Sequence, residues 1–242
     1  MDTVEIQPIL IVSATESECS PTLHQMSGCK AVFPWLYSGT VQGQDIEVLL
    51  SGIGSVATSF RLTQTLMQRP YSRAIAIGIA GSFADDISIG ETVQIAEDCF
   101  ADLGIDNNGQ FRSLREEGLT CGDFDGDFII NPSPTLSPHR KLRGVTVQTA
   151  SGSKKRIDEL VQRFHPQVET MENAAFFYVC RMLKVPFASF RAISNRVEPR
   201  NRKNWRITEA IENLNKSIID LLDGSKFKKN HIYLQTNEII DF

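Results

Sequence analysis

Short apolar runs alternate along this chain with segments of helical periodicity, and this alternation constrains the fold more than any other feature. The strands are apolar on consecutive residues, which is typical of strands buried on both faces. Strands of this kind joined by helices predict a three-layer α/β/α domain around a central mixed, largely parallel twisted sheet. The predicted strands cover residues 8–14, 46–52, 74–81, 91–98, 144–150 and 186–194, and the predicted helices cover 56–67, 154–164, 173–183 and 207–222.

The chain length favours one domain, since 242 residues can bury a large single core. We expect a single domain over 1–242 with its core over about 8–222, and the tail 225–242 is left unassigned. Ser153 stands where a helix N-cap is expected. The segment 102–143 is rich in Gly, Asn, Pro and Asp. A long irregular segment of this kind favours a lid or a subunit contact.

The composition narrows the classes of partner. A net charge of -4 argues against a nucleic-acid-binding face or a membrane surface, so a small-molecule partner is expected. No apolar run reaches the ~20 residues that span a bilayer, which favours a cytoplasmic protein. The five cysteines contain no CxxC pair and the four histidines lack ligand spacing, so neither a disulfide framework nor a metal site is expected.

Polar residues follow the predicted strands. In a sheet covered on both faces, ligands bind beyond the carboxyl ends of the strands. The segments at these ends read, in order, "SATESE", "SGIGS", "GIAGS", "ETMEN" and "AISN". The two glycine-bearing segments, "SGIGS" and "GIAGS", are predicted as turns. Such turns either simply end the strands or let a ligand approach the backbone closely. Because "SGIGS" is not GxGxxG, a dinucleotide site is not predicted.

Three polar side chains in these segments each have a structural and a functional interpretation. Glu172 lies in the polar segment "ETMEN" before the helix predicted from 173. It either caps that helix or binds the two hydroxyls of a ribose diol. Glu18 is either an exposed loop acid or a base that orients water. Asn195 either closes a strand in a turn or recognises a base through its amide.

Together the five ordered segments resemble those of the purine nucleoside phosphorylase/nucleosidase superfamily, and in particular its nucleosidase branch. The resemblance covers about residues 8 to 222. It implies that Glu18 activates the attacking water, that Glu172 binds the ribose diol, and that Met171 packs on the sugar and base. It places Asn195 at the purine. Four further residues of the matching segments are implied in substrate binding: Ile79, Ala80, Gly81 and Ser194.

Asn195 departs from the adenine-cleaving members of the branch, which have an Asp acting on purine N7 at this position. An amide can donate to O6 and accept from a protonated N7, so Asn suits a 6-oxopurine such as hypoxanthine. Asn cannot itself supply the N7 proton, which must then come through water or a neighbour. The acidic segment around Glu18 would repel phosphate, so hydrolysis is expected. No cofactor is expected, because the bond is broken by stabilising the leaving group and the developing cation rather than by redox chemistry.

The stretch "FRAISNRVEPRNRKNWRI" is similar to that of the futalosine hydrolases, which release hypoxanthine from futalosine. Futalosine carries an aryl carboxylate on its 5′ side, so this resemblance suggests Arg196, Arg200, Arg202 and Trp205 as its partners. A solvated basic face is the alternative. The resemblance also implies a homodimer. Two other functions stay open: another purine nucleosidase or phosphorylase acting on inosine or methylthioadenosine, and a non-catalytic nucleoside-binding protein.

Overall fold

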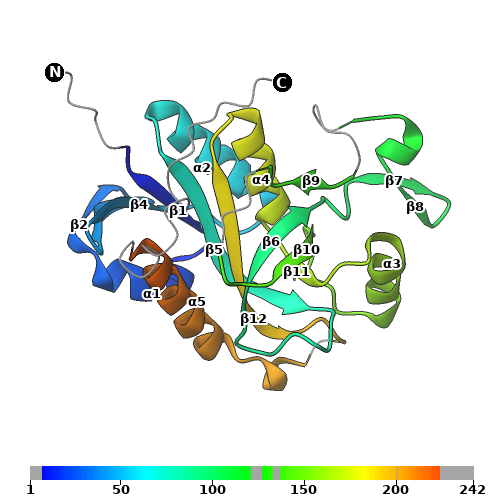
Figure 1. The fold of residues 1–242 in the computed structure, drawn as a ribbon. Helices are drawn as coiled ribbons and strands as arrows, with labels where there is room; N and C mark the ends of the chain where they lie inside the picture. The colour runs from blue at the N-terminus through cyan, green and yellow to red at the C-terminus, as the bar shows by residue number, and fades with distance from the viewer. Residues whose placement is uncertain (1–6, 121–126, 133–136, 200, 224–242) are drawn as a thin grey trace.

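A computed structural model describes residues 7–120, 127–132, 137–199 and 201–223. Its main sheet runs in the order β11-β10-β6-β12-β5-β1-β4-β3-β2, with β9 paired to β6 (Figure 1). The strands of this sheet are β1 (Ile9–Ser13), β2 (Ser27–Phe33), β3 (Leu36–Val41), β4 (Gln44–Leu50), β5 (Arg73–Ser82), β6 (Thr92–Asp98), β9 (Ile129–Ile130), β10 (Lys141–Thr146), β11 (Val168–Thr170) and β12 (Phe187–Arg196).

Helices cover both faces of this sheet, which confirms the predicted three-layer architecture (Figure 1). One layer holds α2 (Ser55–Gln68) and α4 (Asn173–Met182), and the other holds α1 (Glu16–Gln25) and α5 (Ile207–Leu222). A third cluster of apolar side chains joins α3 (Lys154–Phe164) to β10. Ser153 caps α3 as predicted, because its side chain accepts a hydrogen bond from the Arg156 backbone N–H.

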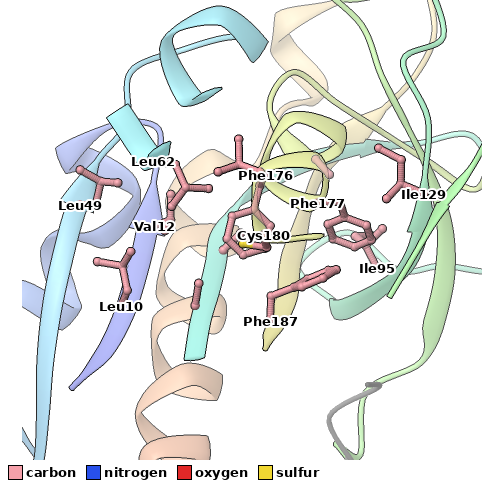
Figure 2. Close-up of a cluster of buried hydrophobic side chains, with 14 of the residues drawn as sticks. Leu10, Val12, Leu49, Leu62, Ile95, Ile129, Phe176, Phe177, Cys180 and Phe187 are labelled. Atoms are coloured by element: carbon pink, nitrogen blue, oxygen red, sulfur yellow. The ribbon is translucent and has the colours of Figure 1, made fainter. Parts of the chain in front are cut away.

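The core under α4 is aromatic. Phe176 and Phe177 of α4 pack against Phe187 of β12, and the Phe177 and Phe187 ring centroids are 4.8 Å apart (Figure 2). Burying a side chain of this size stabilises the fold by about 1.5–3 kcal/mol. This packing fixes the position of α4, and therefore of the polar residues at its N-terminus.

Strand pairing along one edge of β5 is interrupted, which leaves room there for polar side chains from other segments. β12 pairs with β5 along its whole length on one edge. On the other edge β1 ends opposite Ile77, and β11 begins to pair only at Gly81. Residues 78–80 therefore have no strand neighbour on that edge among the described residues. The backbone N–H groups that they direct there must find other partners.

The structure corrects several details of the sequence interpretation. The segment around Glu18 is not a loop but the first turn of α1, and "GIAGS" is not a turn but part of β5. The segment 102–143 contains a hairpin of β7 (Gly104–Asn107) and β8 (Gln110–Ser113), a 3-10 turn η1 (Arg115–Glu117) and β9, although 121–126 and 133–136 lie outside the described residues. The tail 225–242 also lies outside them. None of the helices in the described ranges is long and apolar enough to cross a membrane.

Candidate active site

Glu18 closes the interrupted edge of β5. Its Oε1 atom accepts a hydrogen bond from the Ile79 backbone N–H at 3.1 Å, where a strand neighbour is missing. Its Oε2 atom accepts from the Thr15 hydroxyl at 2.8 Å and from the Thr15 backbone N–H at 3.2 Å, and the bond from the backbone N–H is one half of a capping box between Thr15 and Glu18. Glu18 is thus held at both oxygens and joins the start of α1 to the middle of β5.

Glu172 stands at the N-cap position of α4, but its side chain does not cap the helix. Its Oε1 atom accepts from the Gly54 backbone N–H at 2.9 Å, and no side-chain capping bond is made at this helix start. Instead the backbone N–H of Asn173 donates to the Thr170 hydroxyl, and the backbone N–H of Ala174 donates to the Thr146 hydroxyl. The capping interpretation of Glu172 is therefore wrong, and its carboxylate faces the glycine turn after β4.

The glycine turn after β4 has a conformation that favours glycine. Gly52 and Gly54 have φ values of +85° and +88°, in the region that residues with a Cβ rarely adopt. This turn aims the Gly54 N–H at the Glu172 carboxylate. Burial raises the pKa of Glu172 above its ordinary value, and the Gly54 amide and the charge of Arg191 oppose that rise.

Arg191 interacts electrostatically with the carboxylates of both Glu18 and Glu172. A Cβ placed on Gly78 would lie 3.0 Å from Glu18 Oε1 and 3.4 Å from Arg191 Nη1, so both groups meet over the bare backbone of β5. The guanidinium is buried, with Arg191 only 3% exposed, and interacts electrostatically with Glu172, Glu18 and Asp98. Burial lowers the pKa of Arg191, and these three carboxylates oppose that shift.

A buried polar network holds Arg191 from behind. Asn173 donates to Asp98 Oδ2 at 2.9 Å and accepts from Arg191 Nη2 at 3.4 Å and from the Ser189 hydroxyl. Because the Asn173 amide faces a carboxylate on one side and donors on the other, its orientation is fixed. Thr146 donates to the other oxygen of Asp98 at 2.9 Å. Burial raises the pKa of Asp98 to about 7.

Arg191 and Asn173 are site residues that the sequence interpretation missed. The signal was present in "SFRAIS", where a charged residue interrupts a buried strand. Arginine is almost never fully buried unless it is paired. An Arg at the centre of such a strand therefore predicts buried carboxylates nearby. Its partners could not be named, because Glu18, Asp98 and Glu172 come from three distant segments.

Asn195 of β12 lies beside Gly81, nearer the carboxyl end of β5 than Gly78. A bulge in β12 after Ile193 brings Asn195 opposite Gly81. Asn195 Nδ2 would lie 3.2 Å from a Cβ on Gly81 and donates to the Arg196 carbonyl at 2.8 Å. Its Oδ1 accepts from the Ser194 hydroxyl at 2.7 Å. Gly78 and Gly81 are three residues apart, so Asn195 is displaced from the Glu18 and Arg191 pair by about 10 Å along the strand.

A model of the phosphorylase superfamily matches residues 8–222, which is most of the chain. The chain belongs to the phosphorylase superfamily. Futalosine hydrolase of Thermus thermophilus is 29% identical over 78% of this chain and 87% of the relative. A 5'-methylthioadenosine/S-adenosylhomocysteine nucleosidase of Aeromonas salmonicida is 28% identical over 76% of this chain and 84% of the relative. The chain is accordingly a nucleosidase of this type, an N-glycosyl hydrolase.

Solved phosphorylase-superfamily structures share the fold. The 5'-methylthioadenosine/S-adenosylhomocysteine nucleosidase of Neisseria meningitidis, in complex with methylthio-immucillin-A, aligns with a TM-score of 0.77 at 19% identity, over 90% of this chain and all of the other. Futalosine hydrolase of Helicobacter pylori strain 26695 aligns with a TM-score of 0.70 at 19% identity, over 93% of this chain and 99% of the other. These likenesses support the three-layer architecture and the mixed sheet.

The remaining predicted residues of this superfamily member lie around the same strand ends. Met171 is half-buried beside Glu172, and its carbonyl accepts from the Ser55 hydroxyl. The Ile79 side chain is partly buried against the core. The Ala80 methyl is buried in the core, so only its backbone faces the site, where its carbonyl accepts from the Ser194 hydroxyl. Their contacts with a substrate stay predictions.

The basic segment is divided between two settings. The Arg196 guanidinium turns back to the loop after β5 and donates to Ser82 and to the carbonyls of Ala84 and Asp85. Arg202, in the short 3-10 turn η2 (Arg202–Asn204), is exposed, and its guanidinium lies 6.0 Å from the centroid of the Trp205 ring. Arg200 lies outside the described residues. The described part of the chain contains no cluster of three or more His, Cys, Asp or Glu suited to a metal ion.

Proposed function

We propose that this nucleosidase is a futalosine hydrolase. It would hydrolyse the N-glycosidic bond of futalosine, releasing hypoxanthine and dehypoxanthinylfutalosine in the alternative menaquinone pathway. The relatives by sequence include both futalosine hydrolases and 5'-methylthioadenosine/S-adenosylhomocysteine nucleosidases, so the choice between substrates depends on the chain's own residues.

The observation that carries the proposal is the amide at Asn195. Its carboxamide has two N–H donors and two acceptor lone pairs. One donor is used by the Arg196 carbonyl and one acceptor position by the Ser194 hydroxyl. One donor and one acceptor position are left for a ligand. This pair complements O6 and a protonated N7 of hypoxanthine, whereas the 6-amino group of adenine would face the donor.

Hydrolysis is supported by the acids around Glu18. In the proposed reaction a water oxygen attacks C1′ of the ribose while the bond from C1′ to N9 breaks, and Glu18 takes the proton that the water loses. The hypoxanthine leaves with a proton at N7 that solvent water delivers, and Glu18 returns its own proton to solvent when the sugar has left. Glu172 would bind the 2′ and 3′ hydroxyls beside the positive charge that develops on the sugar. Glu16 and Glu18 in the first turn of α1 disfavour phosphate as the nucleophile.

The basic segment supplies candidates for the 5′ group. Arg202 and Trp205 would hold the aryl carboxylate of futalosine by an ion pair and by packing, with Arg200 as a further candidate. Arg196 is engaged with carbonyls of the loop after β5, so we assign it to holding that loop near the pocket. Arg196 thus has a structural role, and the exposed Arg202 is the candidate for substrate binding.

The exposed face of α2 supports a homodimer. Val56, Phe60 and Met67 of α2 are 81%, 64% and 73% exposed and follow one another at helical spacing, and Ile53 in the turn before the helix is 63% exposed. Contiguous apolar surface of this kind marks interaction sites in soluble proteins. The face begins next to Gly54, which binds Glu172. A second copy on this face would therefore lie beside the ribose end of the site.

One assay tests the proposed function against its rivals. Purified protein is given futalosine, inosine or methylthioadenosine, each with and without phosphate, and the released base is measured. We expect hypoxanthine from futalosine without phosphate. Cleavage of inosine only with phosphate would identify a phosphorylase, preferential release of adenine from methylthioadenosine would identify the other nucleosidase, and binding without cleavage would identify a silent binding protein. Each of these three results contradicts the proposal.

A further inference from the structure

The buried face of α5 carries one polar residue near its centre, Asn215. The buried side chains of this helix are Ala210, Leu214, Asn215, Ile218, Ile219 and Leu222, and Asn215 is 0% exposed. Burying an amide costs free energy unless it is hydrogen-bonded, and asparagine is a weaker helix former than leucine. A leucine would continue the apolar face, so the polar side chain costs stability here unless its hydrogen bonds offset the loss.

The Asn215 amide uses its full hydrogen-bonding capacity. Its Nδ2 group donates to the Glu18 carbonyl at 2.8 Å and to the Ile211 carbonyl at 2.7 Å. Its Oδ1 atom accepts from the Thr22 hydroxyl at 2.6 Å and from the Thr22 backbone N–H at 3.2 Å. A carboxamide has two donors and two acceptor positions, so the orientation of this one is fixed. Asn215 thereby joins α5 to α1, and the two helices lie beside each other (Figure 1).

These contacts hold a turn of α1 that a proline weakens. In an α-helix the carbonyl of Glu18 and the N–H of Thr22 face each other, and Asn215 bonds both groups. Pro21 lies inside the same turn. It has no N–H for the Ser17 carbonyl, and a proline ring in a helix interior presses against the carbonyl four residues earlier. The backbone from Glu18 to Thr22 is therefore held from outside the helix, by an amide 197 positions from Glu18.

The position of this backbone determines whether the Glu18 carboxylate reaches β5. Glu18 Oε1 accepts from the Ile79 backbone N–H at 3.1 Å. Both bonds to Glu18 Oε2 come from Thr15 at the start of α1, so they move with the helix. A shift of about 1 Å would take the bond to Ile79 out of hydrogen-bonding range, and a misplacement of that size can lower a catalytic rate by about 100-fold.

We propose that Asn215 is a positioning residue, which holds the backbone of Glu18 so that the carboxylate meets the Ile79 N–H and faces the attacking water. The inference rests on the proposed function, because that function makes Glu18 the base. The competing explanation is that Asn215 only fastens α1 to α5, while the apolar contacts of Cys19 and Leu23 with the core keep Glu18 in place. Only the first explanation makes the bond to Ile79 depend on the amide in a folded protein.

The first test measures native-state hydrogen exchange at the Ile79 N–H in Asn215→Leu. Leucine has a similar size, continues the apolar face of α5 and leaves the two α1 backbone groups to pair with each other. We expect exchange at Ile79 to rise by at least about tenfold, the effect of losing one hydrogen bond to a charged group. Exchange at Ile77, which lies opposite Ser13 of β1, should stay at the wild-type rate. A general loss of stability would accelerate both amides instead.

The second test measures turnover of whichever of futalosine, inosine and methylthioadenosine the wild type cleaves. Asn215→Leu should lower kcat by at least about tenfold, because the base is misplaced. Its calorimetric affinity for the released purine should stay within about threefold, because Asn195 lies on β12 and not on α1. Asn131→Leu is the matched control, since it removes another buried amide, which donates to the Phe187 carbonyl at 2.9 Å. It should lower stability and leave kcat and Ile79 exchange unchanged.

If Asn215→Leu does not fold, the double variant Asn215→Leu with Thr22→Val replaces both partners of the buried bond by apolar groups, which costs less than removing one. A folded variant with unchanged Ile79 exchange would overturn the proposal, and so would unchanged kcat beside an inactive Glu18→Gln protein. An active Glu18→Gln protein would contradict the proposed function of Glu18 instead. Exchange at Ile79 needs no substrate, so it then decides by itself whether Asn215 positions the carboxylate.

Discussion

Glu172 Oε1 lies 2.9 Å from the backbone nitrogen of Gly54, a residue 118 positions away in the chain. This hydrogen bond joins the start of α4 to the turn between β4 and α2. It uses one carboxylate oxygen to fix the side chain, and it places the carboxylate where Arg191 and Glu18 act on it. Several expected outcomes depend on this arrangement and on the buried network behind it.

Replacing Glu18 by Gln should abolish turnover while nucleoside affinity stays within about tenfold of wild type, because the change removes the base but keeps the shape. Release of hypoxanthine from futalosine measures turnover, and calorimetry with the same nucleoside measures binding. Glu16→Gln, in the same turn but exposed, is the matched control and should stay active. A fully active Glu18→Gln protein would remove this residue from the mechanism.

Replacing Glu172 by Gln should reduce kcat/KM for a ribonucleoside by about 10- to 100-fold, because a carboxylate accepts from a diol more strongly than an amide does. The 2′-deoxynucleoside provides the internal control. Wild type should discriminate strongly against it, and the variant should discriminate much less. Equal discrimination by the two proteins would show that Glu172 does not contact the 2′ hydroxyl.

Gly78→Ala should impair catalysis more than folding. The added Cβ would lie 3.0 Å from Glu18 Oε1 and 3.4 Å from Arg191 Nη1, so it displaces the two groups that meet over β5. We expect kcat/KM to fall by at least about tenfold while the free energy of unfolding changes by no more than about 1 kcal/mol. Urea denaturation and steady-state kinetics on the same sample decide this. Full activity would mean that the space above Gly78 is not used.

Asp98 should make the folded protein less stable as pH rises. Its pKa is about 7 when folded and near its ordinary value of 3.8 when unfolded, so between these values the folded state binds the extra proton. The free energy of unfolding should therefore fall as pH rises from about 4 to 7, by up to about 1.4 kcal/mol per unit, and level off above 7. Asp98→Asn should flatten this slope. Urea titrations at several pH values measure it, and an unchanged slope would exclude Asp98 as its source.

Phe60→Glu should convert the proposed homodimer to a monomer, because it places a charge in the centre of the apolar α2 face. Light scattering after size-exclusion chromatography measures the mass. Glu212→Lys, a charge change on exposed α5 surface away from α2, is the control and should not alter it. A wild-type protein that is already monomeric at micromolar concentration would contradict the dimer.

The sequence by itself determined the elements whose stability is mostly local. The helix predicted over 207–222 is observed as Ile207–Leu222, because its apolar residues recur at helical spacing and bury one face. The buried strands β1, β5 and β12 were likewise recognisable from continuous apolar runs. The order of the polar segments at their ends indicated which residues to inspect, and it predicted Glu18, Glu172 and Asn195.

Only the tertiary structure decided what these side chains contact. α1 is short, mostly polar and contains Pro21, and β2 is exposed throughout, so neither carries a hydrophobic pattern that predicts it. The contacts of Glu18 with Ile79 and of Glu172 with Gly54 depend on where β1 stops and where β11 starts along β5. Local spacing carries no information about such register. Long-range strand pairing sets this register. The register in turn brings Glu18, Glu172, Arg191 and Asn195 close to β5.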